Sequence, residues 1–94
     1  MLIVTEKVLT EYGKVILELI DQGPTDTDKA NILETLQKLT VDFRNNGSGE
    51  YNDCEVGMLC WFGEAMRYAK NDLFPAVAEY IKKALDCYNY YQNK

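Results

Sequence analysis

The chain has 94 residues and 47% of them are hydrophobic, so it is long enough for one domain and too apolar for a disordered segment. Its 15 acidic and 10 basic residues give a formal net charge of −5, which disfavours binding to nucleic-acid phosphates. It contains no histidine, which excludes Ser-His-Asp and Cys-His catalysis and histidine-ligated metal sites.

The first predicted helix spans Thr5 to Asp21, because its apolar residues recur at helical spacing. Gly23 and Pro24 follow directly and predict where this helix stops. The apolar stripe, which we expect to face the core, consists of Val8, Leu9, Tyr12, Val15, Ile16, Leu19 and Ile20.

The second predicted helix begins in the run Thr-Asp-Thr-Asp at positions 25–28, which is rich in residues that cap helix N-termini. It ends near Arg44, because residues 45–49 are all turn formers. The loop that follows continues to Asn52 and is the longest connection in the chain. The expected buried face of this helix is Ile32, Leu33, Leu36, Leu39, Thr40 and Phe43.

The third predicted helix, about 53–70, is the element around which we expect the others to pack. Asn52 and Glu55 have the spacing of a capping box at its start. Only two of the fourteen residues after Glu55 are charged, which predicts a helix buried nearly all round. Gly57 and Gly63 lie inside it and predict that another backbone approaches closely.

The fourth predicted helix runs from Leu73 to about Tyr91, with Asp72 as its expected cap and Pro75 in its first turn. Its expected inner stripe is Phe74, Val77, Ile81, Ala84, Leu85 and Tyr88. No segment is typical of a strand. The sequence therefore predicts an all-α protein: a compact four-helix bundle-like domain over residues 1–94, with a central buried helix at about 53–70.

The three cysteines predict free thiols, since their number is odd and no secretion signal is recognisable at the start of the chain. We expect Cys60 to be a small core residue and Cys54 to be an unreactive thiol near the surface, although a helix start can lower a thiol pKa. No run of residues is apolar enough for a membrane span, and we expect a cytoplasmic protein.

Little in the sequence points to catalysis or to a bound cofactor or metal. The loop after Asn46 has Tyr51 and Gly57 where a calcium-binding EF-hand needs glycine and glutamate. The Gly-Ser-Gly at 47–49 has no lysine after it, so phosphate binding there is not expected. A paired-carboxylate or thiol site would be needed for an enzyme, and we expect none.

The segment from Asp42 to Glu55 is the main candidate for binding a partner. Residues 1–66 hold twelve acids and five bases, and this negative charge serves either to attract a basic protein or only to keep the chain soluble. The predicted contact residues are Asp42, Glu50, Tyr51, Asp53 and Glu55. The alternative is a solvated loop whose tyrosine packs on the bundle. A second candidate is the tyrosine-rich end, in which Tyr90 and Tyr91 are the predicted contacts.

Two families resemble parts of this chain. The spacing of Trp61, Ala65, Tyr68, Phe74, Ile81 and Ala84-Leu85 is similar to one tetratricopeptide repeat, although Glu64, Val77 and Asn89 depart from that pattern. Because a solenoid needs about three repeats, this resemblance implies only an antiparallel helix pair at 61–85.

The second resemblance is to the small acidic helical immunity proteins that neutralise bacterial nuclease toxins such as colicins. Residues 26–51, DTDKANILETLQKLTVDFRNNGSGEY, resemble their second helix and the turn after it. The Asp-x-x-Tyr-Tyr core of their toxin-binding helix is missing, and Glu50-Tyr51 is the nearest equivalent. The resemblance implies a four-helix protein that binds a basic toxin domain.

The expected function is therefore that of a small acidic binding protein, most concretely an immunity protein or antitoxin that blocks a cationic nuclease. A phage-encoded inhibitor that mimics nucleic-acid charge would use the same physics. A helical homodimer or scaffold subunit is the structural alternative, with the first helix or the tyrosine-rich end as its interface.

Overall fold

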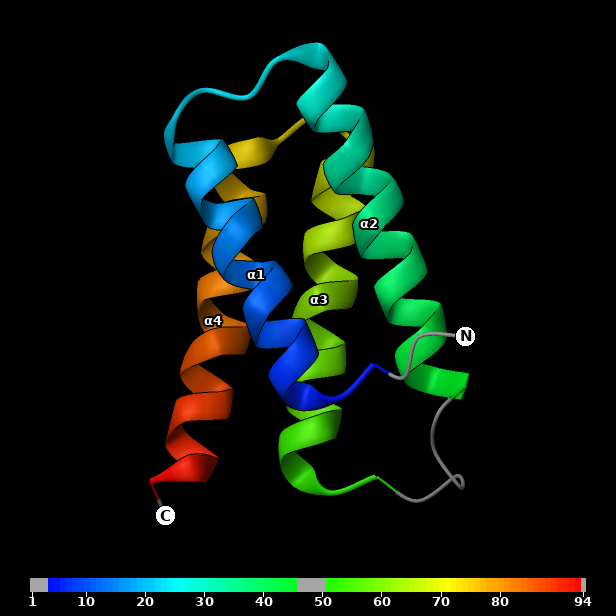
Figure 1. Cartoon of the computed structure of the whole chain (residues 1–94), viewed down its shortest axis with the longest axis vertical. Helices are drawn as coiled ribbons and strands as arrows, with labels where there is room; N and C mark the ends of the chain where they lie inside the picture. Colours follow the sequence, from blue (N-terminus) through cyan, green and yellow to red (C-terminus); the bar gives the residue numbers. More distant parts are fainter. Residues whose placement is uncertain (1–3, 46–50, 94) are drawn as a thin grey trace.

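The computed structural model describes residues 4–45 and 51–93, and these form four helices that run alternately up and down (Figure 1). Their bounds are α1 Glu6–Asp21, α2 Asp26–Asn45, α3 Asp53–Lys70 and α4 Phe74–Gln92. The predicted all-α, four-helix fold is confirmed, and each helix lies within a residue or two of its expected position.

Short polar side chains fix where three of the helices begin. The caps of α2 and α3 were predicted, and the cap of α1 was not. Thr5 caps α1 by accepting a hydrogen bond from the backbone N–H of Val8 at 3.2 Å. Thr25 and Asp28 bond each other's backbone N–H groups at 3.1 Å at the start of α2. Asn52 and Glu55 do the same at the start of α3, so the predicted capping box is present.

The start of α4 differs from the prediction that Asp72 caps it. Asp72 adopts a left-handed backbone with φ of 59°, and its carboxylate forms an ion pair with Lys29 at 3.2 Å instead. The cap position falls on Leu73, which makes no side-chain cap hydrogen bond. Pro75 then lies in the first turn of α4, where its missing N–H costs little.

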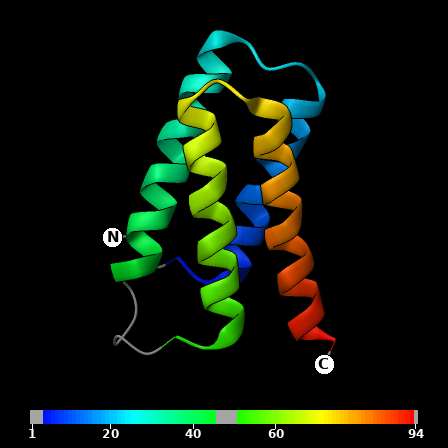
Figure 2. The same cartoon turned by 180° about the vertical axis from the view of Figure 1, so that it is seen from behind.

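The helix α3 is central, since it packs extensively against α4 and also against α2, while α1 rests mainly on α4 and has little contact with α2. Only one face of α3 is buried, namely Cys54, Met58, Phe62, Ala65 and Ala69. The prediction that α3 is buried nearly all round is therefore wrong for its opposite face. Figure 2 shows α3 and α4 from behind, with no other described segment in front of them.

The face of α1 that packs on the bundle is turned from the one predicted. Tyr12 and Val15 are 40% and 56% exposed, while Gly13 is buried. A Cβ atom at Gly13 would lie 3.2 Å from side-chain atoms of Ile81 and Leu85. The glycine therefore permits α1 to lie close to α4, a contact that apolar periodicity alone does not show.

The two glycines of α3 have different surroundings. The prediction that another backbone approaches them closely is wrong for both. A Cβ atom at Gly57 would lie 2.7 Å from the sulfur of Cys87, whereas one at Gly63 would meet nothing within 4 Å. Gly57 makes room for a side chain of α4, and Gly63 lies against open space.

The same substitution at these two glycines is expected to have opposite effects. Gly63→Ala should raise the free energy of unfolding by about 1 kcal/mol, because alanine favours the helix and fills empty space. Gly57→Ala should lower it by roughly 1–3 kcal/mol, since Cys87 must move out of a packed position. Urea unfolding of both variants, followed by circular dichroism in dilute protein, measures the difference. Equal effects at the two positions would contradict the α3–α4 packing.

Candidate functional site

One end of the bundle brings together the segments that the sequence left as separate candidates. Because the helices alternate in direction, α1 and α3 begin at the lower end of Figure 1, and α2 and α4 end there. Asp42 in the last turn of α2, Asp53 in the first turn of α3, and Tyr90 and Tyr91 in the last turn of α4 therefore share this end. Asp53 and the tyrosine-rich end are therefore parts of one surface.

A hollow of about 360 Å³ lies at this end, and we call it the basal hollow. It is lined by Glu6, Asn52, Asp53, Cys54, Tyr91 and Gln92. The side-chain amide of Asn52 donates to the carboxylate of Glu6 at 3.4 Å, which links the starts of α1 and α3. Asp53 is exposed, so its carboxylate is open to a partner.

The two tyrosines have different positions at this end. Tyr91 is half-buried in the wall of the basal hollow, and Tyr90 is 62% exposed. Their rings meet edge to face, with centroids 5.1 Å apart. Desolvation raises the pKa of Tyr91, and the negative charge of Asp53 raises it further, so these two residues lie within electrostatic reach. The phenol of Tyr91 therefore keeps its proton near neutral pH and can donate a hydrogen bond.

Tyr51 and Glu55 have structural roles. The ring of Tyr51 lies against Phe43 at 6.3 Å between centroids, and its hydroxyl donates to the backbone carbonyl of Arg44. The Glu55 carboxylate accepts the backbone N–H of Asn52 at 3.1 Å in the capping box. Both side chains are half-buried and held by these hydrogen bonds, so they form a rigid edge of the surface rather than projecting into solvent. Glu50 lies outside the described residues.

Asp42 reaches the same end of the bundle but lines a different hollow. It borders a groove of about 300 Å³ between α1 and α2, which Tyr12, Glu34 and Lys38 also line. The structure thus places Asp53 and Tyr91 together and keeps Asp42 on a neighbouring face.

This end of the bundle carries carboxylates, helix ends and two exposed bases, Lys7 in the first turn of α1 and Arg44 in the last turn of α2. The last turn of α4 contains no basic residue to offset the partial negative charge of its terminus. Among the described residues, the ion pairs formed within 4 Å are Lys29–Asp72 and Glu64–Arg67, and neither involves the basal hollow. Lys83 of α4 lies over the ring of Trp61 at 5.1 Å rather than beside these acids.

The cysteines lie opposite to where the sequence predicts them. Cys54 is buried and Cys60 is exposed. Cys54 is on the side of α3 that carries Met58 and Phe62, whereas Cys60 is on the outward side. Burial, with a smaller effect of the Glu6 carboxylate, raises the pKa of the Cys54 thiol to about 12. The helix-start effect that could activate this thiol is therefore outweighed by desolvation.

Sequence reasoning missed Glu6 as a member of this site. The signal available was an acidic residue directly after the capping residue Thr5, which is also explained by the helix dipole. Nothing local indicates that the starts of α1 and α3 lie side by side, because Glu6 and Asn52 are 46 positions apart in the chain.

In the described part of the chain, no group of three or more cysteine, aspartate or glutamate side chains is arranged to hold a metal ion. None of the four helices, over the same residues, has the length and apolar character required to cross a bilayer. Comparisons with protein families, with characterised proteins and with solved structures find no match to this chain.

Proposed function

We propose that the basal end of this bundle binds a basic protein and covers its working surface. The concrete form is an immunity protein or antitoxin that blocks a cationic nuclease toxin. The observation that carries the proposal is the convergence of Glu6, Asp53, Tyr90 and Tyr91, contributed by three helices, at one hollowed and exposed end. Carboxylates beside aromatic rings are suited to lysine- and arginine-rich surfaces.

The charge arrangement supports binding rather than internal neutralisation. The lysines of α4 are not paired with the carboxylates around the basal hollow, and Lys83 interacts with Trp61 and Tyr80 instead. These lysines therefore do not neutralise the carboxylates, whose negative electrostatic potential would speed association with a cationic partner.

The inhibition would be stoichiometric and would require no bond to be made or broken. Asp53 and Glu6 would occupy positions that a nuclease reserves for substrate phosphates, and Tyr90 would add a large apolar contact. The rigid edge formed by Tyr51 and Glu55 would limit how the partner docks, because both side chains are already held by α2 and α3.

Charge reversal at the basal hollow is expected to weaken partner binding by roughly a hundredfold, mainly through slower association. The variant is Glu6→Lys with Asp53→Lys, and the partner tested is a basic protein that the wild type captures from a lysate of the source cell. Binding is measured by surface plasmon resonance at two salt concentrations, and inhibition by titration of its nuclease activity.

The matched control is Glu18→Lys with Asp21→Lys, which makes the same change in charge at the far end of α1, where both residues are exposed. This control should keep nearly the full affinity. Equal losses in both variants would indicate a general charge effect, and unchanged affinity in the basal variant would overturn the proposed site.

A further inference from the structure

The outward face of α3 is a stripe that no other described helix covers, exposed at every position except the half-buried Gly63. Its members recur at steps of three and four, so they lie on one side of the helix. We call this face the outer α3 stripe, and its residues are Asp53, Val56, Cys60, Gly63, Arg67 and Lys70. Val56 is 48% exposed and Cys60 is exposed, so apolar groups lie open in the middle of the stripe.

The middle of the stripe can accept another helix at close range. A Cβ atom at Gly63 would meet nothing within 4 Å, so this position leaves free space on the helix surface. Beside it lies a hollow of about 410 Å³, whose lining includes Leu59, Trp61 and Met66. A small residue next to apolar neighbours lets two helix backbones approach and bury these side chains.

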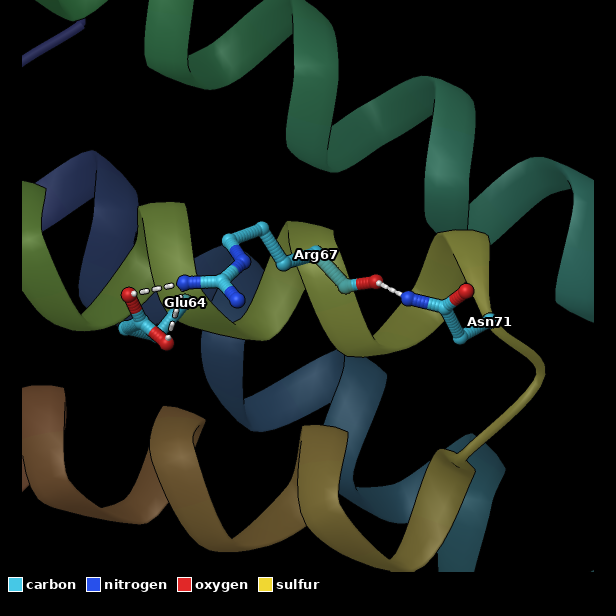
Figure 3. Close-up of polar contacts among 3 residues, drawn as sticks. All are labelled: Glu64, Arg67 and Asn71. Carbon is cyan, nitrogen blue, oxygen red and sulfur yellow. Dashed lines mark hydrogen bonds and ion pairs between the residues drawn. The ribbon is translucent and has the colours of Figure 1, made fainter.

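The two ends of the stripe carry opposite charges. Asp53 lies at the start, and Arg67 and Lys70 lie at the end. The Arg67 guanidinium reaches back along α3 to both oxygens of Glu64, at 3.2 and 3.4 Å (Figure 3). The arginine stem therefore lies along the outward surface, with 71% of its side chain exposed.

We infer that the outer α3 stripe is a self-association surface, on which a second copy of this chain packs its own α3 antiparallel. The two-fold axis passes midway along α3, between positions 61 and 62. Asp53 then lies opposite Lys70 of the second copy, Val56 lies opposite the stem of Arg67, and Cys60 lies opposite Gly63.

A second copy fits this stripe because the charges of the stripe are complementary to those of the same stripe running in the opposite direction. An antiparallel copy brings each acidic start to a basic end, and a parallel copy would bring like charges together. The apolar and small residues meet at the axis, where a two-fold contact is most crowded. One helix pair buries less than the roughly 1,200 Å² of a stable interface, so a weak, concentration-dependent dimer is expected.

Gly63→Lys tests this inference, because a long charged side chain at the axis prevents close approach while open space around Gly63 leaves the monomer intact. Sedimentation equilibrium of the protein alone should show the wild type rising from 10.8 kDa toward twice that mass over roughly a hundredfold range of concentration. Gly63→Lys should remain at the monomer mass throughout. The control Ala30→Lys adds the same charge at an exposed position of α2 and should behave as the wild type does.

A charge exchange distinguishes the antiparallel pairing from other contacts. Lys70→Glu should weaken the dimer by roughly tenfold, and adding Asp53→Lys should restore it. Circular dichroism confirms that both variants remain helical. A wild type that stays monomeric at every concentration would overturn the inference, and so would a dimer that Gly63→Lys leaves unchanged.

Discussion

Phe62→Ala should lower the free energy of unfolding by about 3–5 kcal/mol, which is a large part of the stability of a domain of this size. Phe62 has 0% exposure, and its ring end lies 3.5 Å from the Cβ position of Gly13. The ring therefore fills the point where α1, α3 and α4 meet. Its removal leaves a cavity that α1 and α4 cannot easily close, because Ile81 and Leu85 already lie 3.2 Å from the position that a Cβ atom of Gly13 would occupy.

Urea unfolding followed by far-ultraviolet circular dichroism measures this effect. The control is Val41→Ala on α2, where a 54% exposed side chain should change the stability by less than about 0.5 kcal/mol. A loss of less than 1 kcal/mol at Phe62, within roughly the error of such a measurement, would mean that the three helices do not converge on this ring.

Cys54 should react with iodoacetamide about a thousandfold more slowly than an ordinary thiol in the folded protein at pH 8. The reason is that burial raises its pKa to about 12, so very little thiolate is present, and little of the sulfur is accessible. Cys60 is exposed and should be the first thiol to be modified. Mass spectrometry of peptides after timed labelling measures each rate, and unfolding in guanidinium should bring the rates close together.

The same pKa shift predicts how stability depends on pH. The folded protein holds the Cys54 proton more tightly than the unfolded chain does, so this contribution is complete below pH 9 and is lost as the pH rises toward 12. Rapid labelling of Cys54 in the folded protein would overturn this account and would restore a reactive thiol as a basis for catalysis.

The helix starts show how much of the fold was predictable. Thr25 and Asn52 each cap the helix that follows, and both were recognisable because capping depends on residues within one turn. Gly23 takes a positive φ of 85° before Pro24, as its place after α1 indicated. Asp72 was the exception, because Lys29, 43 positions earlier in the chain, holds its carboxylate.

The candidate site was predictable in its parts and not in its assembly. Asp53 and Tyr91 were both expected to contact a partner, but they were treated as alternatives because 37 intervening residues separate them. The antiparallel packing of α3 on α4 places them in the wall of one hollow. Glu6 joins them because α1 packs antiparallel on α4, which places the start of α1 beside the start of α3. Tyr51 was expected to be either a free contact or a packed one, and its bond to Arg44 fixes it on the bundle.

The sequence by itself determined the helices, their ends and the excess of negative charge, because these depend on local spacing, short-range capping and composition. Only the tertiary structure decided which face of each helix is buried. Cys54 is buried and Cys60 is exposed, the reverse of what was expected, and Tyr12 is 40% exposed. Burial depends on which helix packs against each face. An apolar helix such as α3 is compatible with burial all round and with one face left for another protein, and only the positions of its neighbours distinguish the two.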